Sequence, residues 1–144
     1  MISLTLHPID IGAAINQVIT PTSGGLNVFI GTTRNHSFAR EVKLLEYEAY
    51  EPMALHTIEQ IEREAREKWP IYGVAIVHRL GRVPVGEASV VIAVSAAHRN
   101  EAFEACRFLI DTLKREVPIW KREHFVDGTS EWSGAKPAKK AKLS

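Results

Sequence analysis

The segment from Ser95 to Glu123 constrains the fold more than any other part of the chain, because it joins a strongly apolar run to an amphipathic stretch that stops at a proline. Apolar residues at helical spacing predict a helix from Arg99 to Leu113, packed against an apolar surface. Pro118 must end it, since proline lacks an N–H and disfavours helical geometry at the preceding residue. We therefore expect the chain to turn there. The residues of the predicted apolar face are Ala102, Phe103, Cys106, Leu109, Ile110 and Leu113.

The chain as a whole alternates between strand and helix patterns in the order β-α-β-β-α-β-β-α-β, which predicts an α+β fold with helices packed on a sheet. The β-branched run Ser89–Ser95 is expected to form a central strand buried on both faces. Leu26–Gly31 is also expected to be a buried strand, and the glycine and proline spacing of Gly81–Gly86 predicts a tight loop. The remaining predicted elements are strands at 2–6, 42–47 and 73–79 and helices at 11–18 and 52–69.

The length of 144 residues predicts one globular domain, which we place at 1–132. It is followed by a Lys-rich tail at 133–144 that is expected to be disordered or to be ordered only by a partner. The four lysines of the tail contribute +4 to a formal net charge of +1, so the remainder carries −3 and is a poor general binder of nucleic acid. No apolar run is long enough to cross a bilayer, and the N-terminal sequence does not resemble a secretory signal. Together with the single cysteine, these features predict a cytoplasmic protein.

Six cationic side chains stand at the ends of predicted elements, where they can converge on an anion. Arginine forks recognise phosphate or carboxylate in a planar, bidentate way, and a lysine screened from water can act as a base or a nucleophile. The alternative, which spacing alone favours, is that these are solvated charges at element ends. The six are Arg34, His98, Arg99, Lys114, Lys121 and Arg122.

Metal and cysteine chemistry are not expected. The histidines His36, His78 and His98 are not accompanied by an HExxH motif, a second cysteine or a carboxylate cluster, so no metal site is predicted. Cys106 falls on the apolar face of the predicted helix and is expected to be a small core residue rather than a nucleophile. We therefore predict no metal and no bound cofactor.

Several separated motifs, in a fixed order, resemble the MoaE family, the large catalytic subunit of molybdopterin synthase. Each motif is weak alone, but their joint order and spacing are specific. The resemblance extends to Trp132 and does not include the Lys-rich tail. The motifs lie within Phe29–Asn35, Leu45–Ala54, Val77–Glu87, Ser95–Ala105 and Leu113–Glu123.

The resemblance implies an α/β hammerhead fold with an additional antiparallel β-sheet subdomain. It also implies a sulfurtransferase of molybdenum cofactor biosynthesis, which places two sulfurs on cyclic pyranopterin monophosphate (precursor Z) to form the dithiolene of molybdopterin. The sulfur would arrive as a thiocarboxylate on the C-terminal Gly-Gly of a small ubiquitin-like partner of the MoaD type. Two catalytic subunits would form a central homodimer with one small subunit at each end, making a heterotetramer.

The family's site residues, carried over motif by motif, place the chemistry at Lys114 and Lys121. The substrate carries a phosphate and the incoming tail a thiocarboxylate, so two anions must be held close together, which accounts for a cluster of cations. A lysine beside other cations has a lowered pKa and can transfer protons. The residues implied to bind the substrate are Thr32, Thr33, Arg34, His98, Arg99, Lys114, Lys121, Arg122 and Glu123.

Two alternatives stay open at this point. One is an anion-binding module that senses a nucleotide or phosphate with the same arginines, and the other is a nucleic-acid binder acting through its lysine tail, which the acidic body disfavours. The sequence also leaves open which lysine performs which step and whether the site is completed across a dimer. It does not identify the physiological small subunit or the role of the tail.

Overall fold

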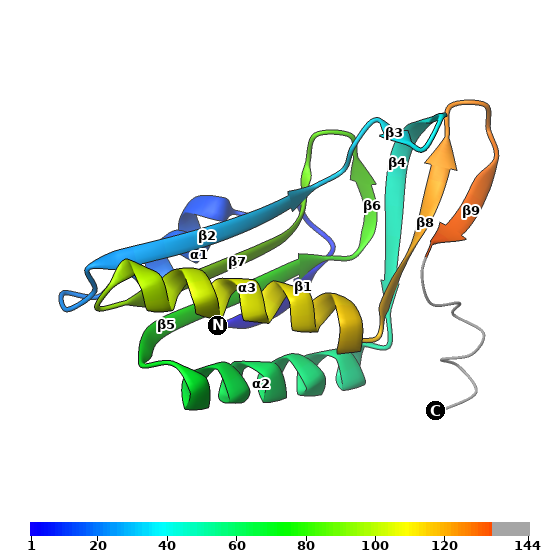
Figure 1. The fold of residues 1–144 in the computed structure, drawn as a ribbon. Coiled ribbons are helices and arrows are strands. Elements are labelled where there is room, and N and C mark those ends of the chain that lie inside the picture. Colours follow the sequence, from blue (N-terminus) through cyan, green and yellow to red (C-terminus); the bar gives the residue numbers. More distant parts are fainter. Residues whose placement is uncertain (134–144) are drawn as a thin grey trace.

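Two β-sheets and three helices make up residues 1–133, the part of the chain that the computed structural model describes (Figure 1). The first sheet has the strand order β1-β5-β7-β2, and the second has the order β3-β4-β8-β9 with β6 also paired to β4. The mixed α+β prediction is therefore confirmed. The helices are α1 (Ile11–Val18), α2 (Glu51–Lys68) and α3 (Arg99–Glu116). The strands are β1 (Ile2–Thr5), β2 (Gly25–Thr32), β3 (His36–Ser37), β4 (Arg40–Ala49), β5 (Ile71–Arg79), β6 (Gly81–Pro84), β7 (Ala88–Ala96), β8 (Ile119–Phe125) and β9 (Ser130–Ser133).

Strand β7 is one of the two inner strands of the first sheet, and its side chains alternate between two hydrophobic layers. Val90, Ile92 and Val94 face the layer formed with helices α2 and α3, whereas Val91 and Ala93 face helix α1. This alternation follows from the two-residue repeat of a strand. The prediction of a central strand buried on both faces is confirmed, and Figure 1 shows β7 running between β5 and β2.

Strand β2 lies at the edge of the first sheet, so the prediction of a buried strand is wrong in this respect. Within residues 1–133 it pairs only with β7, and Leu26 and Ile30 are 36% and 40% exposed. Its other apolar residues include Val28 and Phe29, which pack against the two opposite layers. An apolar run does not reveal whether a second strand lies on its far side.

The segment predicted as a tight loop contains strand β6 followed by a turn. Gly81 has φ of +77° and Gly86 has φ of +85°, in the left-handed region that glycine adopts without steric cost. Between them β6 pairs with β4, Tyr47 lying opposite Gly81 and Leu44 opposite Pro84. The prediction of a loop was therefore incomplete. Because β6 follows β5 directly, the chain passes from the first sheet to the second without a helix, as Figure 1 shows.

Helix α3 extends the predicted helix to Glu116 and connects the two sheets. The Val117 N–H donates to the Leu113 carbonyl at 3.0 Å and closes the last turn, and Pro118 follows. Phe103, predicted on the buried face, is 52% exposed. It stands one residue, about 100° of helical rotation, from the buried row, so it falls at the margin of that face. The buried residues of the helix are Ala102, Ala105, Cys106, Leu109, Ile110, Thr112 and Leu113.

The C-terminal part of the described chain forms β9, a strand that the sequence patterns did not predict. Its last residue, Ser133, is the first residue of the predicted Lys-rich tail, and the rest of that tail lies outside the described residues. In the part of the chain that the structure describes, no helix is long and apolar enough to span a membrane.

Candidate active site

Lys114 and Lys121 lie on either side of the turn that joins α3 to β8. Lys114 stands in the last turn of the helix, and Lys121 is the third residue of the strand. The Pro118 carbonyl between them accepts a hydrogen bond from the Tyr50 N–H at 3.2 Å, which fixes the turn against the end of β4. The reversal of the chain at Pro118 therefore brings both lysines to the same cavities.

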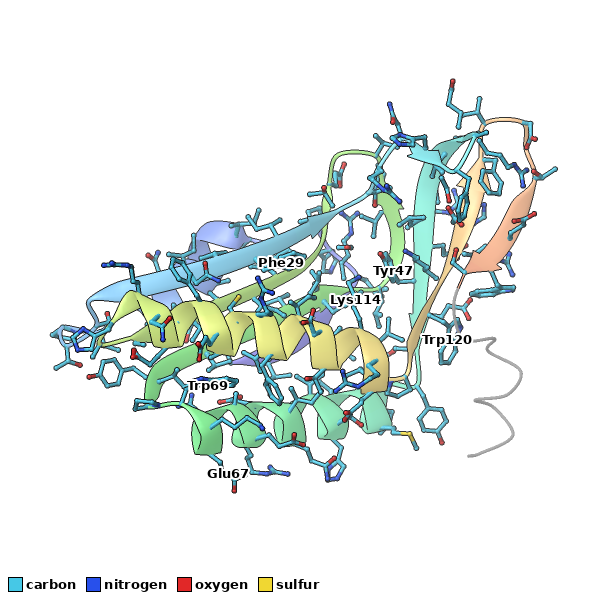
Figure 2. The ribbon with its side chains drawn as sticks, viewed as in Figure 1. Phe29, Tyr47, Glu67, Trp69, Lys114 and Trp120 are labelled. Carbon is cyan, nitrogen blue, oxygen red and sulfur yellow. The ribbon has the colours of Figure 1, made fainter. Side chains whose placement is uncertain are left out.

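Two cavities meet at this lysine pair. The smaller, of about 230 Å³, lies between the C-terminal end of α3 and β8. The larger, of about 600 Å³, extends toward the end of β2 and the β3–β4 hairpin. Figure 2 labels Lys114 and Tyr47 where α3 approaches the second sheet. The residues that line both cavities are Tyr47, Ser89, Lys114, Lys121 and Ser133.

Strand alternation decides which residues of β8 face these cavities. Lys121 lies opposite Tyr47 of β4, and Glu123, two residues further along β8, points to the same side. Arg122 points to the other side, where its guanidinium carbon lies 4.5 Å from the centre of the Trp132 ring. Arg122 lines neither cavity, so the structure does not bring this predicted substrate-binding residue to the lysine pair.

Burial and neighbouring charges shift the pKa values of two of these residues. Burial lowers the pKa of Lys121, and the positive charges of Lys114 and Arg34 lower it further, against the opposing effect of Glu123. Burial alone would raise the pKa of Glu123, but serine hydroxyls and the charges of Lys121 and Arg34 bring it below its usual value. One of these hydroxyls, Ser133 Oγ, donates to Glu123 Oε1 at 2.6 Å.

Arg34, Lys114, Lys121 and Glu123 therefore act on one another as a charged cluster, and all four line the larger cavity. The cluster has three cations to one carboxylate, which suits an anionic ligand. Its half-buried lysine with a lowered pKa can give or take a proton near neutral pH more readily than an exposed lysine. Such an arrangement of charges can support both anion binding and proton transfer.

The end of β2 delivers Thr32 and Arg34 to the larger cavity but turns Thr33 away from it. Thr33 is 3% exposed, its N–H donates to the Glu87 carbonyl at 3.2 Å, and its carbonyl accepts from the Gly86 N–H at 2.9 Å. Thr33 therefore fastens the end of β2 to the turn before β7. The structure brings Thr32 and Arg34, but not Thr33, to the lysine pair.

His98 and Arg99 stand at the opposite end of α3 from Lys114. They line a separate cavity of about 470 Å³, together with Gly24 and Phe103. With a rise of 1.5 Å per residue, the helix separates the backbones of Arg99 and Lys114 by about 22 Å. The six cationic residues that were predicted to converge on one anion therefore do not lie in a single site within one chain.

The cavity residues that were absent from the predicted site include Tyr47, His78 and Ser89. They come from β4, β5 and β7, three strands that only the tertiary fold brings together, and His78 had been considered only as a metal ligand. Cys106 is buried as predicted, and burial raises the pKa of its thiol. Among residues 1–133, no group of three or more histidine, cysteine or carboxylate side chains is arranged to hold a metal ion.

Comparison with known proteins gives concordant matches. Residues 4–116 match the family described as MoaE protein. A molybdopterin synthase catalytic subunit from Rattus norvegicus is 47% identical over 132 residues, which are 92% of this chain and 66% of the rat protein. The crystal structure of molybdopterin synthase from Staphylococcus aureus has a TM-score of 0.86 and 38% identity, covering 92% of this chain and 96% of that one. A complex of subunits 1 and 2 of molybdopterin-converting factor from Helicobacter pylori shares the fold, with a TM-score of 0.77 at 19% identity, over 94% of this chain and 91% of that one.

Proposed function

Because this chain belongs to the MoaE family, we propose that it is the catalytic subunit of molybdopterin synthase and transfers sulfur from a small partner protein to cyclic pyranopterin monophosphate. The observation that carries the proposal is the pairing of Lys114 and Lys121 at the junction of two cavities, beside Arg34 and Glu123. Two cavities that share one lysine pair suit a reaction in which two anionic reactants arrive from different directions.

The larger cavity is the better place for the pterin. Thr32 and Arg34 lie on its wall, and a guanidinium recognises a phosphate through two parallel hydrogen bonds. The apolar side chains of Phe29 and Leu45 on the same wall suit a flat heterocycle. In this arrangement Arg34 holds a phosphate that does not react, while the carbons that receive sulfur lie toward Lys121.

The smaller cavity is the better place for the partner's tail. It holds only about 230 Å³ and lies along the C-terminal end of α3, beside Lys114 and Lys121. Only residues without side chains pass easily through such a space, which fits a C-terminal Gly-Gly thiocarboxylate. A small ubiquitin-like protein ending in Gly-Gly is therefore the proposed partner, with its terminal sulfur delivered to the lysine pair.

In this reaction Lys114 and Lys121 have different roles. The thiocarboxylate sulfur attacks a pterin carbon that bears oxygen, so that a C–S bond forms as the C–O bond breaks and the leaving oxygen takes a proton from the lysine pair. Water then hydrolyses the resulting thioester between pterin and partner, which leaves sulfur on the pterin and a carboxylate on the partner. Lys121, with its lowered pKa, takes the proton from the attacking water. Lys114 stabilises the negative charge on the tetrahedral intermediate. A second partner molecule repeats the sequence for the second sulfur of the dithiolene.

His98 and Arg99 join this site if two copies of the chain pair. They line a cavity at the far end of α3, so one chain cannot present them to its own Lys114. We therefore propose a homodimer in which each copy supplies His98 and Arg99 to the lysine pair of the other. Arg122 has no direct contact with substrate in this scheme, because it lies against Trp132 on the opposite face of β8.

Other features follow the family assignment. We propose that the two sheets and three helices correspond to an α/β hammerhead with an additional antiparallel subdomain. A catalytic domain at 1–132 and a cytoplasmic location are part of the same proposal. The binding of a regulatory nucleotide or phosphate without turnover remains the rival to an enzyme, since the same cations would serve it.

An assay with a thiocarboxylated partner separates these functions. The chain is expected to convert cyclic pyranopterin monophosphate to molybdopterin when a small protein ending in a Gly-Gly thiocarboxylate is added. Adding one residue after the final glycine should abolish sulfur transfer while calorimetry shows that docking survives, because a displacement of about 1 Å can already cost about a hundredfold in rate. Equal transfer from the native and extended partners would refute delivery of the terminus to this site, and anion binding without turnover would favour the sensor.

A further inference from the structure

His78 is a buried imidazole at the lysine pair, and the mechanism above leaves it unused. It belongs to β5, is 4% exposed, and lines the smaller cavity together with Lys114 and Lys121. A buried imidazole costs free energy unless its polar atoms find partners. Its place beside the reacting groups therefore calls for a role beyond filling the core.

A hydrogen bond to the backbone fixes the tautomer of this ring. His78 Nδ1 lies 2.8 Å from the carbonyl oxygen of Arg79, which can only accept, so Nδ1 carries the proton. Burial, assisted by the charge of Lys114, lowers the pKa of His78 to about 4 although the backbone hydrogen bond opposes the shift. The ring is therefore neutral at physiological pH, and Nε2 carries a free lone pair.

The orientation of the ring is held from a second side by Tyr47. The two ring centroids lie 4.9 Å apart with an interplanar angle of 71°, an edge-to-face contact. Tyr47 in turn lies opposite Lys121 in the ladder between β4 and β8. The imidazole is thus fixed between a backbone carbonyl and an aromatic ring, within the wall that the two lysines share.

We propose, building on the proposed function, that His78 is a positioning residue: its Nε2 accepts a hydrogen bond from the Lys114 ammonium, directly or through one water, and directs that ammonium toward the reacting sulfur. A neutral acceptor suits this task. It orients the ammonium without cancelling the positive charge that the two anionic reactants require, whereas a carboxylate in the same place would neutralise it.

Two substitutions separate the two nitrogens of the ring. In His78→Asn the amide nitrogen can replace Nδ1 as donor to Arg79, but no acceptor remains at the place of Nε2. In His78→Gln the longer amide reaches the place of Nε2 and can offer its oxygen there. His124→Asn is the matched control, because His124 is a half-buried imidazole of β8 that pairs with Glu46 and lines neither cavity.

The assay is sulfur transfer from the thiocarboxylated Gly-Gly partner to cyclic pyranopterin monophosphate. We expect His78→Asn to lower kcat about a hundredfold, as a misplaced reacting group does, with KM within about twofold of wild type. His78→Gln should recover at least about tenfold of that loss, and His124→Asn should keep the wild-type kcat.

Three results would overturn the inference. One is a folded His78→Asn variant with wild-type kcat. Another is an equal loss of kcat in the Asn and Gln variants that parallels an equal loss of thermal stability, which would assign His78 to structure alone. If the wild-type chain itself transfers no sulfur, the proposed function fails and this inference fails with it, so the two failures are told apart by the wild-type measurement.

Discussion

Lys121 of β8 lies directly opposite Tyr47 of β4 in an antiparallel ladder, which places the lysine side chain in the wall shared by two cavities. The next residue, Arg122, points to the other face of the same sheet and stacks on Trp132. One step along a strand thus separates a residue that can touch both reactants from one that can touch neither.

Arg34 lines the larger cavity and Arg122 lines neither cavity, so substitutions of these two arginines should have different effects on catalysis. Arg34→Ala should raise KM for the pterin with a smaller effect on kcat, because Arg34 lines the larger cavity and is proposed to hold a phosphate that does not react. Arg122→Ala is the matched control and should leave both constants near wild type. Steady-state kinetics on the two variants checks this, and a raised KM for Arg122→Ala with none for Arg34→Ala would reverse the assignment.

Mixing two inactive variants tests whether the site is shared between copies. If His98 and Arg99 act on the lysine pair of the other copy, a dimer of one Arg99→Ala chain and one Lys121→Ala chain contains one intact site and one doubly altered site. After equal amounts exchange subunits, half of the dimers are mixed, so about one quarter of wild-type activity should return. Activity that stays at the level of the parent variants, despite exchange shown by mass spectrometry, would show that Arg99 does not act on the lysine pair of the other copy.

The buried His78 predicts a pH-dependent loss of stability. In the unfolded chain a histidine takes up a proton near pH 6.5, whereas His78 in the folded chain does so only at about 4. The unfolded state therefore binds more protons in this window, and the free energy of unfolding falls as the pH drops through it. The difference between these two pKa values corresponds to a loss of about 3 kcal/mol in the free energy of unfolding.

The measurement is urea denaturation of wild type and His78→Gln at several pH values. Acidic groups contribute equally to both proteins, so the advantage of wild type over the variant should shrink by about 3 kcal/mol between pH 7 and pH 4. A difference that stays constant with pH would mean that the imidazole is not buried in its neutral form.

Gly73 lies so close to the backbone of helix α1 that an added methyl group is expected to destabilise the fold. A Cβ at this position would lie 2.7 Å from Val18 Cα, where helix α1 packs on strand β5. Gly73→Ala should therefore lower the free energy of unfolding by about 1–3 kcal/mol. Gly12→Ala is the control, because a Cβ there meets its nearest neighbour at 3.7 Å and helix α1 should gain about 0.5–1 kcal/mol. Equal melting temperatures for the two variants would contradict the packing described here.

Local sequence patterns predict much of the first sheet and of the lysine pair. The β-branched run at β7 can only be buried on both faces, and the proline after α3 forces the reversal that brings Lys121 back to Lys114. Patterns of this kind act within a few residues. They therefore specify an element and its end, but not its neighbours: the edge position of β2 and the pairing of β6 with β4 depend on contacts remote in sequence.

The candidate site shows the same division. The alternation of side chains along a strand places Arg122 and Lys121 on opposite faces, and the rise of a helix places Arg99 far from Lys114. Both arguments can be made from the sequence, but only once the strand and the helix have been assigned. Tyr47 and His78 carry no such local signal. They reach the lysine pair because β4 and β5 belong to different sheets that meet there, which only the tertiary structure reveals.

The most direct test of the central claim is the single-turnover rate of sulfur transfer from a thiocarboxylated Gly-Gly partner, measured for wild type, Lys114→Ala and Lys121→Ala. Lys43→Ala serves as control, because Lys43 is an exposed lysine of β4 that lines neither cavity. We predict that each cavity lysine variant loses about 10²–10⁴-fold in rate while partner affinity and melting temperature stay near wild type, and that the control loses nothing. Near wild-type rates in both Lys114→Ala and Lys121→Ala would contradict the account.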